Sequence, residues 1–181
     1  MWSDFKNTKS WQRGMDKEDE LSKLLTENGD EHHKATEDEN KKQHIDFHIK
    51  KYGSCDVKAM KKFHSNEPEQ DEYICIEFQD NQGNLGWVDS KTTDCIAFEF
   101  KNHYSIVKTL ELSALARKLC KIPTNSMGEV LPTVTRKKPY TLYHRGKWGN
   151  NDIIGFIRSS DLDCLILEKI VKPEKEDSLW I

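Results

Sequence analysis

The fold that the sequence predicts is built around one stretch, Ile45-Asp46-Phe47-His48-Ile49-Lys50-Lys51-Tyr52-Gly53-Ser54-Cys55-Asp56-Val57-Lys58-Ala59-Met60. It reads as two strands, 45–49 and 55–60, joined by a turn in which glycine supplies the positive φ that a tight reversal often needs. Side chains alternate between the two faces of a strand. We therefore expect Asp46, Asp56 and Lys58 to share one face of the hairpin. The opposite face is apolar and consists of Ile45, Phe47, Ile49 and Val57.

Asp46, Asp56 and Lys58 are the residue types of a metal-dependent hydrolytic site. Two neighbouring carboxylates repel each other unless a cation lies between them, and hard ions such as Mg²⁺ or Mn²⁺ prefer oxygen ligands. Such an ion lowers the pKa of a coordinated water and neutralises charge on a phosphate. Lys58 is expected roughly 6.5–7 Å from Asp56 along the same face, where it can orient the attacking water or contact the phosphate. The alternative is a polar face that is simply exposed to solvent.

Later segments repeat the alternation of apolar and polar residues. Residues 73–78 and 95–100 are each predicted to form a strand, and residues 104–108 a further one. Their apolar side chains are Ile74, Ile76, Phe78, Ile96, Phe98 and Phe100. We expect the hairpin and the strands 73–78 and 95–100 to form one mixed sheet with a single apolar side. Glu77 and Glu99 then fall on the polar face that carries the charged residues of the hairpin.

Leucines at helical spacing predict a helix over residues 15–28 and an amphipathic helix over 110–120. The predicted fold class is therefore α/β, with a central mixed sheet flanked by helices. Glu18 borders the inward face of the first helix. It either reaches the site above the sheet or is an acid that favours the helix N-terminus. Residues 30–43 are expected to be a charged connection.

The composition indicates a soluble protein of one domain, 1–181, because 33% of its 181 residues are charged and 35% are hydrophobic. Five cysteines lie too far apart for CxxC pairs, so we expect reduced thiols and a reducing compartment such as the cytoplasm. The sequence has no signal-peptide pattern and no apolar run of about 18 residues, so we expect neither secretion nor a membrane partner.

Charge is distributed unevenly, although the net charge is only −3. Residues 15–40 hold ten acids and three lysines, whereas residues 108–147 hold nine Lys or Arg and two Glu. Basic side chains interleaved with aromatic ones suit phosphate groups and bases. The predicted nucleic-acid-binding residues are Arg136, Lys137, Lys138, Arg145 and Lys147. The alternative is a solvated basic loop, in which case neutralising all five would leave the salt dependence of DNA binding unchanged.

The order of these features resembles the PD-(D/E)XK nuclease superfamily, which has the restriction-endonuclease-like fold. The residues that carry the resemblance are His44-Ile45-Asp46-Phe47, Asp56-Val57-Lys58-Ala59, Ile76-Glu77-Phe78, Gly86-Trp87 and Ile96-Ala97-Phe98-Glu99. The combination is similar to small bacteriophage proteins of this group and spans roughly residues 18–160. It places the nuclease-like core at about 15–160 and a C-terminal extension at 161–181.

The resemblance implies an αβββαβ-type core, one or two Mg²⁺ or Mn²⁺ ions, and an endonuclease that cleaves DNA. Asp46 would be the first metal ligand, Asp56 the second, and the backbone carbonyl of Val57 a further one. Lys58 would be the motif lysine, and Glu77 a further ligand or a holder of metal-bound water. No proline precedes Asp46, and Gln79 takes the place of a lysine after Glu77, so Asp56-Val57-Lys58 must serve as the motif.

Two other hypotheses remain open from the sequence. One is a catalytically silent nucleic-acid-binding or protein-interaction module on the same fold. The other is a small-molecule or zinc enzyme that uses His44 and His48. The expected partners of the nuclease are DNA and, as one option, a second copy of the chain. A phage-encoded member would act in the host cytoplasm.

Overall fold

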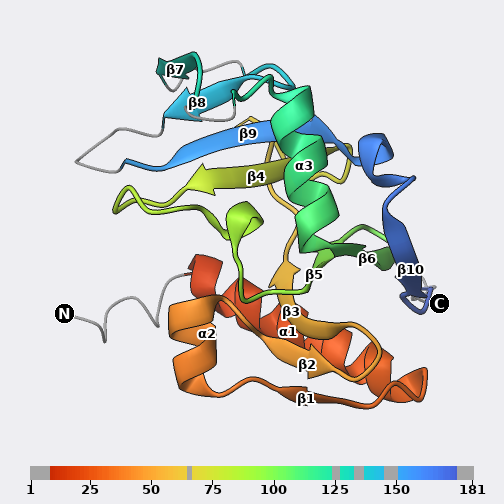
Figure 1. The fold of residues 1–181 in the computed structure, drawn as a ribbon. Helices are drawn as coiled ribbons and strands as arrows, with labels where there is room; N and C mark the ends of the chain where they lie inside the picture. Colours follow the sequence, from red (N-terminus) through yellow and green to blue (C-terminus); the bar gives the residue numbers. More distant parts are fainter. Residues whose placement is uncertain (1–8, 65–66, 124–126, 133–136, 145–150, 175–181) are drawn as a thin grey trace.

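The computed structural model describes residues 9–64, 67–123, 127–132, 137–144 and 151–174 (Figure 1). The helices are α1 (Lys9–Glu27), α2 (Glu37–Gln43) and α3 (Thr109–Leu119), with the short 3-10 helices η2 (Trp87–Asp89) and η3 (Ser159–Leu162). The strands are β1 (His32–Lys34), β2 (Phe47–Ile49), β3 (Gly53–Lys58), β4 (Tyr73–Gln79), β5 (Cys95–Glu99), β6 (His103–Lys108), β7 (Val130–Pro132), β8 (Leu142–His144), β9 (Ile153–Arg158) and β10 (Ile166–Val171). The chain is thus an α/β protein with mixed sheets flanked by helices.

The strands form two sheets, and the prediction of one sheet is wrong. The six-stranded sheet has the order β1-β2-β3-β5-β6-β10, and the four-stranded sheet has the order β4-β9-β8-β7. β3 and β5 are parallel, as are β7 and β8, and the other neighbours are antiparallel. The segment 73–78 is a strand, as expected, but it pairs with β9. Alternation of side chains predicts a strand without specifying its neighbours, which is why the sequence did not separate the sheets.

β2 and β3 form the predicted antiparallel hairpin, with Phe47 opposite Cys55 and Ile49 opposite Gly53. Gly53 has a φ of 85°, a conformation that side chains other than glycine rarely adopt. A Cβ atom there would lie 2.3 Å from a carboxylate oxygen of Asp94. The glycine is therefore required both for the reversal of the chain and for the close approach of Asp94.

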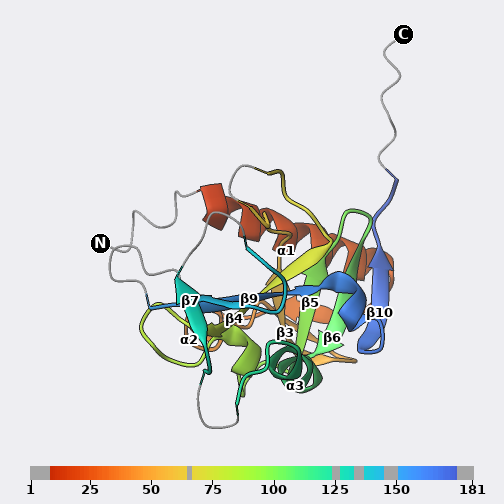
Figure 2. The same cartoon turned by 90° about the horizontal axis from the view of Figure 1, so that it is seen from above.

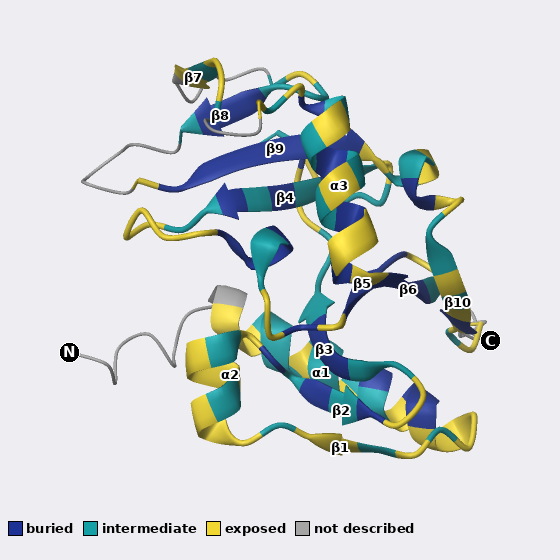
Figure 3. Ribbon diagram, viewed as in Figure 1, coloured by how far each residue is buried: buried dark blue, intermediate teal, exposed yellow. Residues whose placement is uncertain are grey.

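Two hydrophobic cores lie on opposite faces of the six-stranded sheet, one beneath α1 and the other beside α3 (Figure 2). The core beneath α1 contains Leu21, Phe47 and Ile49. The core beside α3 joins both sheets and contains Ile76 and Phe98. Figure 3 shows that β9 is buried along most of its length, whereas α2 and the outer side of α3 are largely exposed.

The two cores correct the expectation of a single apolar side. Ile74, Ile76, Phe78, Ile96, Phe98 and Phe100 share the core beside α3. Phe47, Ile49 and Val57 lie in the core beneath α1 instead. Because β3 is parallel to β5, Asp56 stands opposite Ile96 and projects from the same face. A parallel strand buried on both faces has no solvated polar side, so Asp56 is buried.

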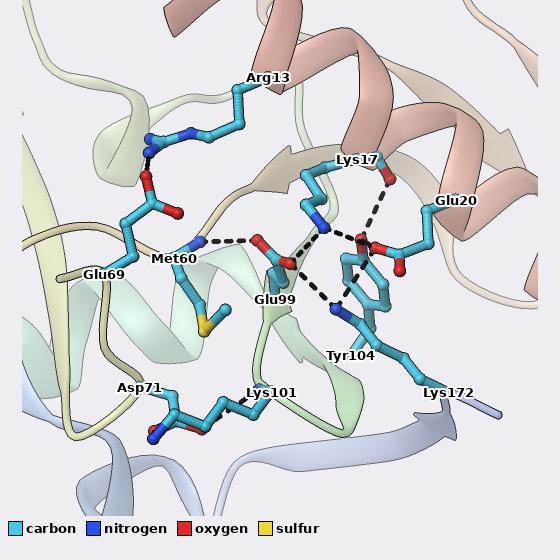
Figure 4. Close-up of polar contacts among 10 residues, drawn as sticks. All are labelled: Arg13, Lys17, Glu20, Met60, Glu69, Asp71, Glu99, Lys101, Tyr104 and Lys172. Atoms are coloured by element: carbon cyan, nitrogen blue, oxygen red, sulfur yellow. Dashed lines mark hydrogen bonds and ion pairs between the residues drawn. The ribbon is translucent and has the colours of Figure 1, made fainter. Parts of the chain in front are cut away.

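Glu99 is buried beneath α1, and the expectation that it shares the face of Asp56 is wrong (Figure 4). Its Oε1 atom lies 2.8 Å from Nζ of Lys17 and 2.9 Å from Nζ of Lys172. Its Oε2 atom accepts a hydrogen bond of 3.0 Å from the backbone N–H of Met60. Glu99 therefore links α1, β5, the end of β3 and the segment after β10.

Replacing Glu99 by Gln is expected to lower the free energy of unfolding by about 2–3 kcal/mol, because two partly buried ammonium groups lose the buried carboxylate that they share. Glu20 is the matched control. Its carboxylate also contacts Lys17 (3.0 Å) and Lys172 (3.3 Å), but its side chain is 36% exposed. Glu20→Gln should cost about 1 kcal/mol or less. Urea denaturation of both variants at neutral pH measures the difference, and equal costs would contradict the structural role of Glu99.

Candidate metal centre

The structure brings Asp46, Asp56 and Lys58 together at the hairpin. The side chains of Asp56 and Lys58 both leave β3, and Nζ of Lys58 lies 2.6 Å from Oδ2 of Asp56. Asp46 precedes β2, and its Oδ2 atom accepts a hydrogen bond of 2.7 Å from the backbone N–H of Val57. Two carboxylates and one ammonium group therefore converge where β2 begins and β3 ends.

Asp56 is only 3% exposed. Its Oδ2 atom forms an ion pair of 2.6 Å with the Lys58 ammonium, which compensates the buried charge in part. Burial raises the pKa of Asp56 to about 7; Lys58 opposes this rise and Asp46 adds to it. A buried carboxylate beside a second carboxylate is costly, and one ammonium group does not remove that cost here.

Asp46 is held in place by two donors. In addition to the Val57 N–H, its Oδ1 atom accepts a hydrogen bond of 2.6 Å from Nδ2 of Asn40 on α2. α2 begins at a capping box, in which the Thr36 side chain accepts from the Glu39 N–H and the Glu39 side chain accepts from the Thr36 N–H. The short helix thus fixes Asn40 and, through it, the orientation of the Asp46 carboxylate.

Glu18 on α1 adds a third carboxylate to the surroundings of Asp46. Burial raises the pKa of Glu18 to about 7, and the negative charge of Asp46 contributes to the rise. Lys58 is also close enough to influence Glu18. Of the two sequence interpretations of Glu18, this placement favours the one in which the side chain lies near the site.

Lys58 lies beneath the aromatic ring of Trp87, with Nζ 5.0 Å from the ring centroid. Burial lowers the pKa of Lys58, but Asp56, Asp46 and Glu77 outweigh it and raise the pKa above its usual value. η2 can carry Trp87 to this place because residue 86 is glycine: a Cβ there would lie 2.2 Å from the backbone oxygen of Glu77. Lys58 is therefore a charged and positioned ammonium group.

Glu77 lies on β4, so it belongs to the four-stranded sheet and not to the sheet that carries the hairpin. Its charge is close enough to influence Lys58. It lines a cavity of about 500 Å³ together with His44 and with Lys41 and Lys42 of α2, whereas Asp46, Asp56 and Lys58 do not line that cavity. Figure 1 shows α2 and the end of β4 on the same side of the molecule. The larger cavity of about 1040 Å³ lies elsewhere, near Gly53, and none of the four carboxylates above lines it.

The donor set suits a hard cation that keeps much of its water. Mg²⁺ is often bound through only one or two carboxylates. Asp46 and Asp56 supply such a pair, and the raised pKa of Asp56 beside Asp46 shows that a further positive charge would be favourable there. Within the described ranges, no three or more His, Cys, Asp or Glu side chains gather closely enough to hold a metal ion. The zinc hypothesis therefore lacks a ligand set there, and His48 instead pairs with Glu39 at 3.1 Å.

The predicted DNA-binding residues are only partly placed. Arg136, Arg145 and Lys147 lie outside the described residues. Nζ of Lys137 lies 4.8 Å from the ring centroid of Phe156, and the backbone N–H of Lys138 donates to the Tyr143 hydroxyl at 2.6 Å. Both lysines therefore sit on the four-stranded sheet.

Comparisons with family models, with curated proteins and with solved structures gave no match. No helix in the described part of the chain is both long and apolar enough to cross a membrane.

Proposed function

We propose that the chain is a metal-dependent endonuclease that hydrolyses phosphodiester bonds in DNA. The observation that supports this proposal most is the buried Asp56 carboxylate, whose pKa is raised to about 7 beside Asp46 although it forms an ion pair with the Lys58 ammonium. The half-buried Asp46 and Glu18 also influence each other there, so several carboxylates crowd a single ammonium group, which is unfavourable unless a further cation joins them. Such strain is typical of functional sites.

The Asp46 and Asp56 carboxylates, with the backbone carbonyl of Val57, would hold Mg²⁺ or Mn²⁺. When bound, the ion supplies a water of lowered pKa and neutralises charge on the phosphate. Lys58 donates hydrogen bonds to the attacking water or to a phosphate oxygen. Its position between Asp56 and Trp87 limits its freedom, so little reorganisation is needed when the substrate binds. Glu77 influences Lys58 electrostatically and would hold water that is bound to the ion.

The fold supports a restriction-endonuclease-like core in part. Helix α1 packs on the hairpin that carries Asp46 and the Asp56-Val57-Lys58 motif, which is the order that the resemblance implies. The placement of β4 in a separate sheet departs from a single central sheet. We propose that this departure opens the cavity between Glu77 and α2, next to the segment that leads into Asp46.

A catalytically silent nucleic-acid-binding or protein-interaction module is the second candidate. The observation in its favour is that both oxygens of Asp46 already accept hydrogen bonds, from Asn40 and from Val57. A carboxylate has about four acceptor positions, so these bonds leave room for an ion. We therefore rank the nuclease first.

Cleavage assays on supercoiled plasmid, linear duplex and single-stranded DNA distinguish the two candidates. We expect nicking or cutting in Mg²⁺ or Mn²⁺ and none in EDTA, together with saturable metal binding in a calorimetric titration. If the protein binds no Mg²⁺ or Mn²⁺ at millimolar concentration, the nuclease proposal is wrong. Metal binding without any cleavage would favour the silent module.

A further inference from the structure

Many cationic side chains in the described ranges have a carboxylate partner. Exposed lysines on α1, on β1 and after β2, namely Lys23, Lys34 and Lys50, pair with Glu27, Asp19 and Glu31. Lys61, Lys62 and Lys138 are exposed and have no ion pair with any carboxylate of the described residues. The same holds for Lys91, Lys118, Lys121, Arg158 and Lys169, so what sets the first three apart is their position. Unpaired exposed lysines are available to an anionic partner without breaking an existing contact.

Lys61, Lys62 and Lys138 belong to two chain segments that meet at His64. The segment that follows β3 contains Lys61 and Lys62, and the other contains Lys138. They are joined where the backbone N–H of Lys137 donates to Nδ1 of His64 at 3.4 Å. Segments 73 residues apart in sequence are thus brought together.

An aromatic base supports this junction. The ring of Phe63 lies 4.5 Å from that of His64 and is stacked on that of Tyr73 at 4.3 Å. It also contacts Phe156 edge to face at 5.1 Å, and Lys137 lies over that same Phe156 ring. Phe63 is only 8% exposed. The segments that carry the basic residues are therefore anchored by a cluster of packed aromatic rings.

The nearby acids do not cancel this positive charge. Glu69 pairs with Arg13, and Asp71 pairs with Lys101. Glu67 is exposed, and its backbone N–H donates to the His64 carbonyl oxygen at 3.2 Å. Glu67 forms no ion pair with the lysines within the described ranges. Lys61, Lys62 and Lys138 therefore keep their positive charge at this junction.

The junction is continuous with the candidate metal centre. Lys61 follows Lys58 by only three positions, and both line one small cavity of about 30 Å³ whose wall also contains Trp87 and Tyr73. An anionic chain whose phosphate reached Lys58 would therefore meet Lys61 and Lys62 next. A polymer of phosphates at regular spacing fits such a line of unpaired lysines.

We propose that Lys61, Lys62 and Lys138, on the junction at His64, form a binding surface for the phosphodiester backbone of DNA leaving the candidate metal centre. That the DNA runs from the metal centre to this surface rests on the proposed function. The surface itself can be tested by DNA binding alone. The contacts are made to phosphates, so they carry affinity and position the strand without reading its sequence.

The test is DNA binding by fluorescence anisotropy in EDTA, where cleavage cannot interfere. The variant is Lys61→Gln/Lys62→Gln/Lys138→Gln, and the matched control is Lys23→Gln/Lys34→Gln/Lys50→Gln. Both remove the same charge from exposed lysines. A short duplex of mixed sequence and one of its strands are titrated between about 50 and 200 mM salt. Thermal melts establish that both variants are folded.

We expect the junction variant to bind both DNA forms at least about tenfold more weakly and its salt slope on duplex to fall by about 2–3. The control should lose less than about threefold at the same salt concentration. The proposed surface is wrong if the junction variant keeps the wild-type salt slope of DNA binding. It is also wrong if the control variant loses as much DNA affinity as the junction variant does. If wild-type protein binds DNA through these lysines but never cleaves it, this surface stands and the endonuclease proposal fails.

Discussion

Replacing Asp56 by Asn is expected to reduce DNA cleavage by at least about 10²–10³-fold while the protein remains folded. The amide keeps the shape of the side chain but removes the charge that would bind the ion. Metal affinity and cleavage should therefore fall together. The matched control is Asp94→Asn. Asp94 directly precedes β5, and its carboxylate accepts hydrogen bonds from the N–H and the hydroxyl of Ser54, away from Lys58. Metal titration and plasmid cleavage measure both effects.

The same substitution is expected to stabilise the metal-free protein at neutral pH. The pKa of Asp56 in the folded state is about 7, against an ordinary value of 3.8, so the folded protein binds a proton more readily than the unfolded chain does. The stability of the wild type therefore falls as pH rises from about 4 to 7. The gain of Asp56→Asn should be small near pH 4 and reach ~2 kcal/mol above pH 7.

The ammonium group of Lys58 limits the stability that Asp56→Asn can gain, because the substitution removes the carboxylate nearest to it. Asp46 and Glu77 remain close enough to influence the ammonium group. We therefore expect the relief of carboxylate crowding to exceed the loss of the ion pair. Glu18 also has a raised pKa of about 7, so the pH dependence should diminish without vanishing. Thermal melts from pH 4 to 8 in EDTA show the trend, and a less stable variant at pH 8 would contradict this balance.

Added Mg²⁺ should reverse the order of the two proteins. Any ligand that binds only the folded state raises its stability by RT ln(1 + [L]/Kd). The wild type should gain in melting temperature with millimolar Mg²⁺, and Asp56→Asn should gain little. Equal shifts in both proteins would place the ion at other residues.

The hairpin could be predicted from the sequence because its information is local. Alternation, a glycine turn and the Asp-Val-Lys motif all lie within residues 45–60, and the observed register brings Asp46 and Asp56 together. The helix predicted over 110–120 is likewise observed, as α3. Local periodicity is the strongest signal that a single sequence carries.

Residues 30–43 were expected to be a charged connection, and that expectation is wrong. They contain β1 and α2. Their signal was present, because Thr36 followed by Glu39 matches the capping box at a helix start. The segment carries no buried apolar stripe, so periodicity did not reveal it. Asn40, which orients Asp46, was missed for this reason.

The division into two sheets and the position of Glu99 depend on contacts between distant segments. Glu99 and Glu77 occupy similar places in similar strands, yet Glu99 meets Lys17 and Lys172 beneath α1 whereas Glu77 faces the cavity beside α2. Strand pairing decides between these outcomes. Alternation within each strand is the same in both cases, so no local pattern could separate them.

Replacing Lys58 by Met is expected to lower the turnover number by about 10²–10³-fold with the metal site retained. Methionine preserves an unbranched side chain of similar length beneath Trp87 but cannot donate a hydrogen bond. An ammonium group is not a metal ligand, and its positive charge repels a nearby cation. Metal affinity should therefore be unchanged or higher, which is the opposite of the result for Asp56→Asn. KM for DNA should change less than kcat, because the contact acts mainly in the transition state.

Two further variants, Lys58→Arg and Lys50→Met, test whether the effect comes from the hydrogen-bonding group of Lys58 and not from the loss of a positive charge. Arg keeps the positive charge beside Asp56, so it should preserve metal-free stability while its planar group orients water poorly and restores only part of the turnover. Lys50 is exposed and pairs with Glu31 away from the site, so Lys50→Met should cut DNA like the wild type. Parallel calorimetry and single-turnover cleavage separate the two functions of the site. If Lys58→Met loses metal affinity together with turnover, Lys58 acts by holding Asp56 in place; if it cuts DNA at the wild-type rate, Lys58 has no part in the reaction.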